Sequence, residues 1–332
     1  MRAVYVHAFA PFETVGVEEV PDPQPGPGEI VVDVVAAEVN YPDMLVIAGQ
    51  YQFKPPQPFS PGKAAAGRVS ALGAGVRDFA VGDHVAVQVE YGAYAERLKA
   101  RAVNCFRMPA GMPFHMAAAL GLAYQTAWFA LKDRAAFKSG EIVLVLGAAG
   151  GIGIASIQLA KAFGAKMVIA GVRGASNAKV ASQASADHVI DLDVPDVQDR
   201  LREKVHALTG KHGADVVIDP VGGDANAAAL RALAWCGRMV IVGFASNQIP
   251  AIKANYLLLK NIAVIGLQWS DYRERTPERV CEAQREIFAL YEQGRLDPPI
   301  RGRLPLEKFV DGLRALRDGK AQGKIILQVR PE

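Results

Sequence analysis

The sequence predicts an α/β protein with two domains, a partly open β-barrel and a doubly wound parallel sheet. Two observations predict this fold class. Residues 1 to about 110 contain short β-branched runs separated by Gly and Pro, which favours an irregular barrel. From Ile142 onward, strand patterns alternate with helix patterns, which is typical of a parallel sheet covered by helices.

Composition restricts the class of protein. The 332 residues are enough for two domains with sizeable cores, and the hydrophobic (51%) and charged (21%) fractions are those of a globular protein. With 37 Lys+Arg against 34 Asp+Glu, the net charge of +3 does not favour nucleic acid or an anionic membrane as partner.

Cysteine usage and hydropathy point to a compartment. Cys105, Cys236 and Cys281 lie far apart, so neither a disulfide framework nor a clustered zinc site is expected. No apolar run reaches the roughly 18 residues of a membrane span. We therefore expect a cytoplasmic protein.

The first part of the chain contains the barrel strands. An edge strand is predicted at residues 1–5, followed by a Pro-rich connector at 21–28 and further strands at 29–39, 67–72 and 81–87. Near Pro113 the pattern changes to a long Ala-rich helix over 116–131, and the domain boundary is placed here. The predicted domains are 1–118 with 262–332, and 119–261.

The second part contains the parallel sheet. Strands are predicted at 142–146, 167–170, 188–190, 215–218 and 239–243, with 262–267 as a candidate sixth strand. Helices are predicted over 154–163, 197–208 and 227–234.

The last part returns to the first domain. Thr276 as N-cap and Pro277 at the first helical position predict a helix that ends near Gly294. A second amphipathic helix over 306–316 and a closing strand over 324–329 follow.

The turn after the first parallel strand predicts a dinucleotide site. Strand 142–146 leads through Gly147-Ala148-Ala149-Gly150-Gly151-Ile152-Gly153 into a helix, which is the context that a dinucleotide fingerprint requires. Gly150 would let the backbone approach a pyrophosphate, Gly153 would let the helix pack on the strand, and the helix N-terminus would attract phosphate. Ala148 replaces the usual first glycine, so the motif is a variant. The predicted phosphate-binding residues are Ala149, Gly150, Gly151, Ile152 and Gly153.

The end of the second strand indicates which dinucleotide binds. NAD sites usually carry an acid there, but residues 167–173 contain none, and the next acid is Asp187. Arg173, with Ser176 and Lys179 nearby, offers a cation and donors to a 2′-phosphate, which favours NADPH. The alternative is that Arg173 and Lys179 are solvent-facing charges.

At this point the sequence resembles the medium-chain dehydrogenase/reductase superfamily, and within it the zinc-free quinone oxidoreductases, the ζ-crystallin-like group. The resemblance covers nearly the whole chain and implies a GroES-like barrel domain, a Rossmann domain, an active site in the cleft between them and a homo-oligomer, often a dimer. It is carried by Val39-Asn40-Tyr41-Pro42-Asp43, Gly49-Gln50-Tyr51, Pro61-Gly62-Lys63, Gly82-Asp83-His84-Val85, Gly92-Ala93-Tyr94-Ala95-Glu96, residues 117–131 and 147–153, and Gly323-Lys324-Ile325-Ile326-Leu327.

The resemblance also implies that no metal is bound. Zinc-dependent relatives carry Cys, His and Cys around the metal, and the matching positions here are Asn40, Lys63 and Leu122. An amide, an ammonium and an alkyl group cannot make a zinc site. Two positions depart from the quinone reductase pattern, since Ala64 replaces an acid and Leu45 replaces a Tyr.

The expected reaction is hydride transfer from NADPH to a quinone or an α,β-unsaturated carbonyl, because conjugation spreads the developing charge onto an oxygen. Tyr51 is the first candidate to donate a hydrogen bond to that oxygen. The alternative is a half-buried barrel tyrosine. Asn40 is a second donor candidate, and Asp43 is expected to orient other groups. Lys63 would polarise the substrate oxygen, pair with Asp43 or point into solvent.

Other residues are implied around the cofactor. The resemblance puts Thr126 beside the nicotinamide and Lys324 among the cofactor-binding residues. Gly243 and Phe244 follow the fifth strand, at the sheet edge where ligands bind. Leu267 and Gln268 are candidates for the carboxamide, or for a subunit-interface strand.

Two other functions are compatible with the sequence. One is an enone or enoyl-thioester reductase on the same scaffold. The other is a non-catalytic NADPH-binding, RNA-binding or structural protein. The near-neutral charge disfavours nucleic acid, and the intact glycine turn indicates that the cofactor site is in use.

Overall fold

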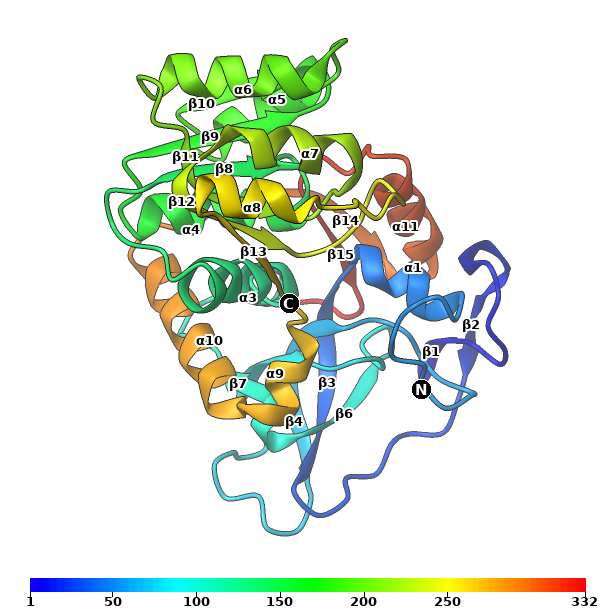
Figure 1. Cartoon of the computed structure of the whole chain (residues 1–332). Coiled ribbons are helices and arrows are strands. Elements are labelled where there is room, and N and C mark those ends of the chain that lie inside the picture. The colour runs from blue at the N-terminus through cyan, green and yellow to red at the C-terminus, as the bar shows by residue number, and fades with distance from the viewer. The chain divides into compact units, whose positions relative to one another are not determined.

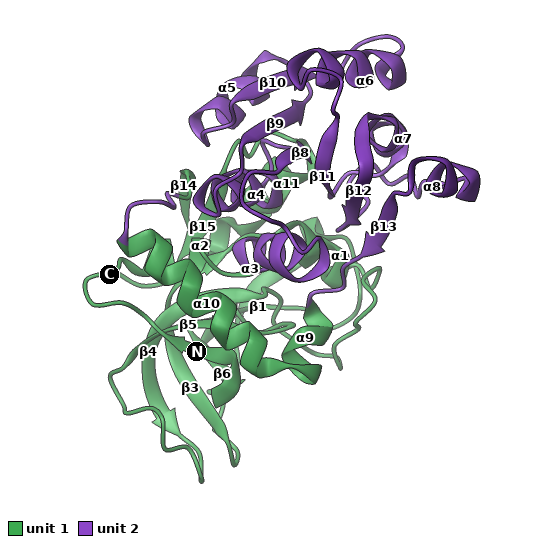
Figure 2. Cartoon of the chain, turned by 60° about the vertical axis from the view of Figure 1, so that its left-hand side comes forward, with its two compact units in different colours: residues 1–122, 270–292, 298–332 green, residues 123–269, 293–297 purple.

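The computed structural model describes residues 1–332, and the chain folds into two compact units (Figure 2). Unit 1 comprises residues 1–122, 270–292 and 298–332, and unit 2 comprises 123–269 and 293–297. The predicted limits, 1–118 with 262–332 and 119–261, differ most at the second crossing, because residues 263–266 belong to the sheet of unit 2. No helix combines the length and the apolar character needed to cross a membrane.

Unit 2 is built on a six-stranded parallel sheet with strand order β10-β9-β8-β11-β12-β13 (Figure 1). The chain runs outward from β8 to β10 and then returns to add β11 beside β8. Ligands bind in this class of sheet where the strand order reverses, here between β8 and β11. The doubly wound sheet and its sixth strand are as predicted. The strands are β8 (Ile142–Leu146), β9 (Met167–Val172), β10 (His188–Asp191), β11 (Ala214–Asp219), β12 (Leu233–Ile241) and β13 (Ala263–Gly266).

The helices of unit 2 include two that the sequence did not predict, α5 and α8. Neither shows a clear apolar stripe, and α8 has no buried side chain at all. The predicted helix over 227–234 ends at Ala232, because Leu233 already pairs with Ala214 in the sheet. The helices are α3 (Leu122–Trp128) with a π-helical turn (Phe129–Arg134), α4 (Gly151–Ala162), α5 (Ala175–Gln183), α6 (Val197–Leu208), α7 (Gly223–Ala232) and α8 (Ala254–Lys260).

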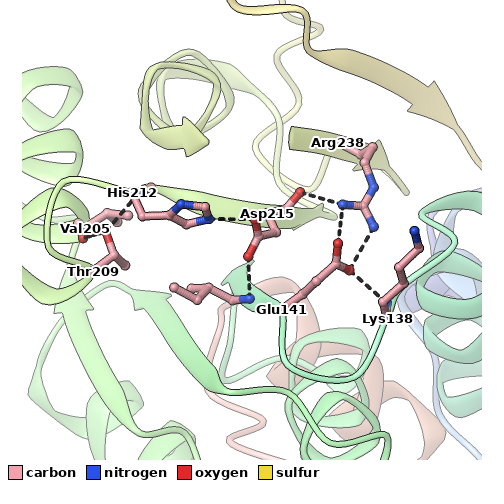
Figure 3. Close-up of polar contacts among 9 residues, drawn as sticks. Lys138, Glu141, Val205, Thr209, His212, Asp215 and Arg238 are labelled. Atoms are coloured by element: carbon pink, nitrogen blue, oxygen red, sulfur yellow. Dashed lines mark hydrogen bonds and ion pairs between the residues drawn. The ribbon is translucent and has the colours of Figure 1, made fainter. Parts of the chain in front are cut away.

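A polar network joins the amino ends of β8, β11 and β12 (Figure 3). Both carboxylate oxygens of Glu141 accept from the Arg238 guanidinium, at 2.8 and 2.9 Å. Asp215 accepts from the backbone N–H of Ile142 at 2.8 Å, and its other oxygen lies 2.8 Å from Nε2 of His212. These contacts fix the strands at the edge of the sheet opposite to the glycine turn.

Unit 1 is a partly open barrel formed by a seven-stranded sheet and a short hairpin. The long strand β3 pairs with β4 along most of its length, with β6 along its first half and with β15 at its end. Strands β14 and β7 end the main strand order, and β6 pairs with β3 alone. The strands are β1 (Arg2–Tyr5), β2 (Gly16–Glu19), β3 (Glu29–Glu38), β4 (Ala64–Leu72), β5 (His84–Gln88), β6 (Arg97–Arg101), β7 (Cys105–Arg107), β14 (Ile300–Pro305) and β15 (Lys324–Gln328).

The sequence did not predict helices α1 and α9 of unit 1, and it predicted one helix where the structure has two. The predicted helix over 116–131 is broken, since α2 ends at Ala119 and α3 starts at Leu122. Gly121 lies at the break, where a Cβ would stand 3.1 Å from the carbonyl oxygen of Ala118. Glycine is a poor helix former, and the Ala-rich sequence around it hides this interruption. The helices are α1 (Tyr41–Ile47), α2 (Phe114–Ala119), α9 (Ser270–Arg275), α10 (Pro277–Glu292) and α11 (Phe309–Arg317), with 3₁₀ turns at Phe12–Thr14, Ala102–Asn104 and Leu306–Lys308.

The close approach of α4 to the turn after β8 generates a prediction. A Cβ on Gly153 would lie 2.3 Å from the carbonyl oxygen of Gly147, so Gly153→Ala forces the helix away from the turn. We expect the free energy of unfolding to fall by about 1–3 kcal/mol, measured by denaturant unfolding. Gly243→Ala is the control, because its Cβ would meet only an oxygen at 3.6 Å. Equal stability of the two variants would contradict this account.

Candidate active site

The glycine turn of unit 2 has the geometry of a phosphate cradle. Gly147 has a positive φ of 58°, which few other residues adopt without strain. Gly150 is the N-cap of α4, and a Cβ there would meet only the Gly147 carbonyl oxygen, at 3.3 Å. The first N–H groups of a helix have no partner within the helix. The turn therefore presents backbone donors and the positive end of a twelve-residue helix, a donor set that suits a pyrophosphate.

Arg173 follows β9 and lines a pocket of unit 2 of about 350 Å³. Gly174 begins α5 with a φ of 77°, while Ser176 and Lys179 are exposed on that helix. Arg173 thus lines a pocket, whereas Ser176 and Lys179, which were predicted to bind the same phosphate, do not line it. The lining residues are Arg173, Leu192, Asp193, Val194, Pro195, Val197, Asp224 and Ala225.

Acidic groups stand beside Arg173, which the sequence reasoning missed. Asp193 and Asp224 line the same pocket, and Asp191 ends β10. Asp191 accepts hydrogen bonds from the backbone N–H groups of Asp193 (2.9 Å) and Gly174 (3.2 Å), and these donors lower its pKa. These acids follow β10 and β11, so an inspection of β9 alone could not find them.

Asp219 fixes the loop at the end of β11. Its side chain is fully buried and accepts from the backbone N–H groups of Val221 (2.8 Å) and Gly222 (3.0 Å) and from the Asn226 amide (2.7 Å). A Cβ on Gly222 would come within 3.0 Å of the Phe244 ring. The segment with Gly243 and Phe244 therefore lies against this loop at the carboxyl edge of the sheet.

The other predicted cofactor residues of unit 2 lie in separate elements. Thr126 is buried in α3. Leu267 is buried and its N–H donates to the carbonyl oxygen of Ile241 at 3.0 Å, so it continues the edge of the sheet, whereas Gln268 is exposed.

In unit 1 the predicted residues Asn40 and Asp43 form a buried hydrogen-bonded pair at the start of α1. The Asn40 backbone N–H and the Tyr94 hydroxyl both donate to Oδ2 of Asp43, at 2.8 and 2.7 Å. Oδ1 of the same carboxyl has no hydrogen-bond partner. Burial raises the pKa of Asp43 to about 7, although Tyr94, Asn40 and the nearby Lys63 favour the ionised form.

Lys63 and Tyr51 lie together in the same unit. Lys63 is only 2% exposed, so the interpretation of it as a solvent-facing lysine is wrong. Its ammonium pairs with Glu90 and stands 4.4 Å from the centre of the Tyr51 ring. Burial lowers the pKa of Lys63 to about 7, and the Asp43 carboxylate opposes that shift. Tyr51 is partly buried, and burial raises its pKa.

Two charged residues next to Lys63 and Tyr51 were missed by the sequence reasoning. Glu90 follows β5 and contacts Arg273 of α9 as well as Lys63. Arg273 is 4% exposed, and burial lowers its pKa to about 10. No local pattern marks either residue, because the contact joins positions 183 residues apart.

Lys324 is buried in β15 and pairs with Glu38, which is fully buried in β3. The Asn40 amide donates to the same Glu38 carboxylate at 3.0 Å. The ammonium of Lys324, predicted to bind cofactor, is thus joined to the Asn40 and Asp43 pair. No three His, Cys, Asp or Glu side chains are arranged to hold a metal ion.

Known proteins resemble this chain over its whole length. The family described as alcohol dehydrogenase GroES-like domain matches residues 26–143, and the zinc-binding dehydrogenase family matches residues 151–284. Quinone oxidoreductase-like protein 2 of Mus musculus is 35% identical over 95% of this chain and 89% of its own length.

Two solved structures are similar in fold as well. Escherichia coli quinone oxidoreductase complexed with NADPH has a TM-score of 0.90 and 30% identity, covering 99% of this chain and 100% of that one. The mycobacterial protein Rv1454c complexed with NADPH has a TM-score of 0.91 and 30% identity, with the same coverage.

The buried carboxyl of Asp43 generates a pH-dependent prediction. Its pKa is raised from 3.8 to about 7, so the folded state holds one more proton than the unfolded state between these values. The contribution of Asp43 to the free energy of unfolding therefore falls as pH rises from about 4 to about 7. Asp43→Asn keeps an acceptor for Tyr94 and has no proton to lose, so we expect this decline to become shallower.

Denaturant unfolding at several pH values across that window measures the slope. Asp33→Asn, which removes a carboxylate paired with Arg97 and Arg330 nearer the surface, is the control. Parallel slopes for the wild type and Asp43→Asn would show that Asp43 does not titrate there.

Proposed function

Because this chain belongs to the quinone oxidoreductase-type group of the medium-chain dehydrogenase/reductase superfamily, we propose that it reduces quinones or related conjugated carbonyls with NADPH and without a metal. Two observations carry the proposal. The glycine turn of unit 2 forms a phosphate cradle, and the polar side chains Asn40, Tyr51 and Lys63 of unit 1 can act on a carbonyl oxygen. An oxidoreductase of this superfamily needs both parts.

NADPH would bind along the carboxyl edge of the unit 2 sheet. Residues 149–153 would hold the pyrophosphate through backbone N–H groups, and Arg173 would pair with the 2′-phosphate. Gly243, Phe244 and Thr126 are proposed to line the rest of the groove. When bound, the nicotinamide supplies a hydride. Two related proteins with known structures are complexed with NADPH, which supports this choice of dinucleotide.

The acceptor is proposed to contact the polar side chains Asn40, Tyr51 and Lys63 of unit 1. A hydride added to a conjugated carbonyl leaves negative charge on its oxygen, and donors in a dry site stabilise that charge more than donors in water. Tyr51 and Asn40 would donate hydrogen bonds to the oxygen, and Lys63 would offer a buried positive charge. Asp43 would hold Asn40 and Tyr94 in place.

An enone or enoyl-thioester reductase is the second candidate. Leu45 stands where many quinone reductases carry a tyrosine, which removes one flat aromatic surface for a quinone ring. A non-catalytic NADPH-binding or RNA-binding protein is the third candidate, and the net charge of +3 speaks against the RNA-binding form.

Oxidation of NADPH against a panel of quinones and conjugated enones tests the reaction. We expect turnover with quinones and no loss of activity after dialysis against a chelator. Turnover with enones alone would move the assignment to an alkene reductase. Tight binding of NADPH without oxidation by any acceptor would contradict both enzymatic proposals.

Substitution of Arg173 tests whether the protein prefers NADPH to NADH. A charge-assisted hydrogen bond contributes about 1.5–3 kcal/mol, so Arg173→Ala should raise the Kd for NADPH by roughly 10- to 100-fold and leave NADH unchanged. Arg200→Ala, an exposed cation on α6, is the matched control. Equal losses for NADPH and NADH would mean that Arg173 does not contact the 2′-phosphate.

We further propose a cytoplasmic homodimer formed through the edge of the unit 2 sheet. Strand β13 has an unpaired edge, and Leu258 and Leu259 of the preceding helix are 77% and 74% exposed. A second copy could extend the sheet and cover these side chains.

Light scattering measures the mass of the particle in solution. Ile265→Lys on β13 should convert a dimer to a monomer, whereas Ile249→Lys, in an exposed loop, should not. A monomeric wild-type protein would refute the dimer.

A further inference from the structure

Five buried charged side chains of unit 1 and the partly exposed Glu90 form one connected group, which we call the buried charge group. Glu38 pairs with Lys324 and also accepts from Asn40, whose backbone N–H donates to Asp43. Asp43 interacts electrostatically with Lys63, and Glu90 contacts both Lys63 and Arg273. The group consists of the carboxylates Glu38, Asp43 and Glu90 and the cations Lys63, Lys324 and Arg273.

Exposure within the group increases along one line of contacts. Asp43 is 0% exposed, Lys63 is 2% exposed, and the side chain of Glu90 is 18% exposed. Lys324 and Arg273 are also nearly inaccessible, at 3% and 4%. Glu90 is therefore the member through which a proton can pass between solvent and Lys63.

The charges of the group balance, which allows a proton to move within it. Three carboxylates and three cations sum to zero, and a proton that moves from Lys63 to Glu90 or Asp43 leaves this sum unchanged. Oδ1 of Asp43 has no partner and can hold such a proton. Burial raises the pKa of Asp43 and lowers that of Lys63, to about 7 in both cases, so a proton can be exchanged between these two groups near neutral pH.

The surroundings of Lys63 are defined by several elements. Asp43 of α1, Tyr51, Glu90 and Arg273 of α9 face it directly. Glu38, Tyr94 and Lys324 lie one contact further away, around Asp43. Tyr51 is also partly exposed, but Glu90 is the carboxylate that combines direct contact with Lys63 and access to water.

We propose that Lys63 gives the proton that completes the reduction and that Glu90 returns a proton from solvent to Lys63. The inference rests on the proposed function, because it assigns the proton source of that reaction. The acceptor takes two electrons and one hydrogen as hydride from NADPH, and its oxygen takes a proton from the Lys63 ammonium. Lys63 is then a neutral amine. The Glu90 carboxylate takes up one proton from solvent, passes it to that amine and is again a carboxylate held by Arg273, so each turnover consumes one solvent proton.

A titration of the ligand-free protein tests the link between Lys63 and Glu90. In protein labelled with ¹³C at the lysine Cε, the Lys63 resonance is identified by its absence in Lys63→Met. We expect it to titrate well below the other lysines, and Glu90→Gln should lower its midpoint further, by about one pH unit or more, because the carboxylate partner is lost. Glu29→Gln, which removes the partner of Lys99, should leave it in place. An unchanged Lys63 midpoint in Glu90→Gln would overturn the relay.

Kinetics with a quinone acceptor test the catalytic role. Lys63→Arg keeps a positive charge but cannot release a proton near neutral pH, so kcat should fall about 10-fold or more. Glu90→Gln should lower kcat and alter its pH profile, with the KM for NADPH within about twofold of the wild type. Lys99→Met is the control for loss of a barrel lysine, and thermal unfolding confirms that each variant folds.

The two experiments fail in different ways. Wild-type kcat and pH profile in both Lys63→Arg and Glu90→Gln would overturn the relay while leaving the reductase intact. If the wild type reduces no acceptor, the proposed function fails, and the relay fails with it as a step of that reaction. The NMR titration then still decides whether Lys63 and Glu90 share a proton equilibrium.

Discussion

Charge buried in a protein must be matched by opposite charge or by hydrogen bonds, and the interior of unit 1 is organised by this constraint. Glu38 of β3 and Lys324 of β15 are both almost inaccessible to water and pair with each other. Removal of one partner of such a pair typically costs about 3–5 kcal/mol, because the other charge remains buried. The antiparallel pairing of β15 with β3 brings Ile326 opposite Glu38. This pairing is therefore coupled to the ion pair between Glu38 and Lys324.

The two edges of the unit 2 sheet differ in how far their polar groups are already paired. At the amino ends of the strands, Glu141, Arg238 and Asp215 are paired with one another or with backbone groups, so this edge has little capacity left for a ligand. At the carboxyl ends, the glycine turn and Arg173 remain available. Because every strand is parallel, all the groups that follow a strand gather at one edge.

Features encoded locally could be predicted from the sequence. The alternation of strands and helices, the glycine turn and the helix start at Pro277 each depend on a short window, and each is present. The predicted cap is not formed, since Oγ1 of Thr276 makes no hydrogen bond. Features that depend on distant partners could not be predicted. Glu90 was overlooked, because the contacts that bury it come from segments far away in the chain. The pairing of Lys324 with Glu38 likewise joins two distant strands. The break at Gly121 and the helix α8 were missed for another reason, since neither produces an apolar periodicity.

The order in which the two units are completed during synthesis follows from the path of the chain. Glu38 and its partner Lys324 are 286 residues apart, and all of unit 2 is made between them. Unit 2 can thus acquire its sheet while β3 still lacks the neighbour that β15 provides. Until then the Glu38 carboxylate lacks its cationic partner and favours a hydrated position. Completion of unit 1 is a late, long-range step, and a nascent chain halted before β15 would expose an unfinished barrel edge to aggregation and to quality control.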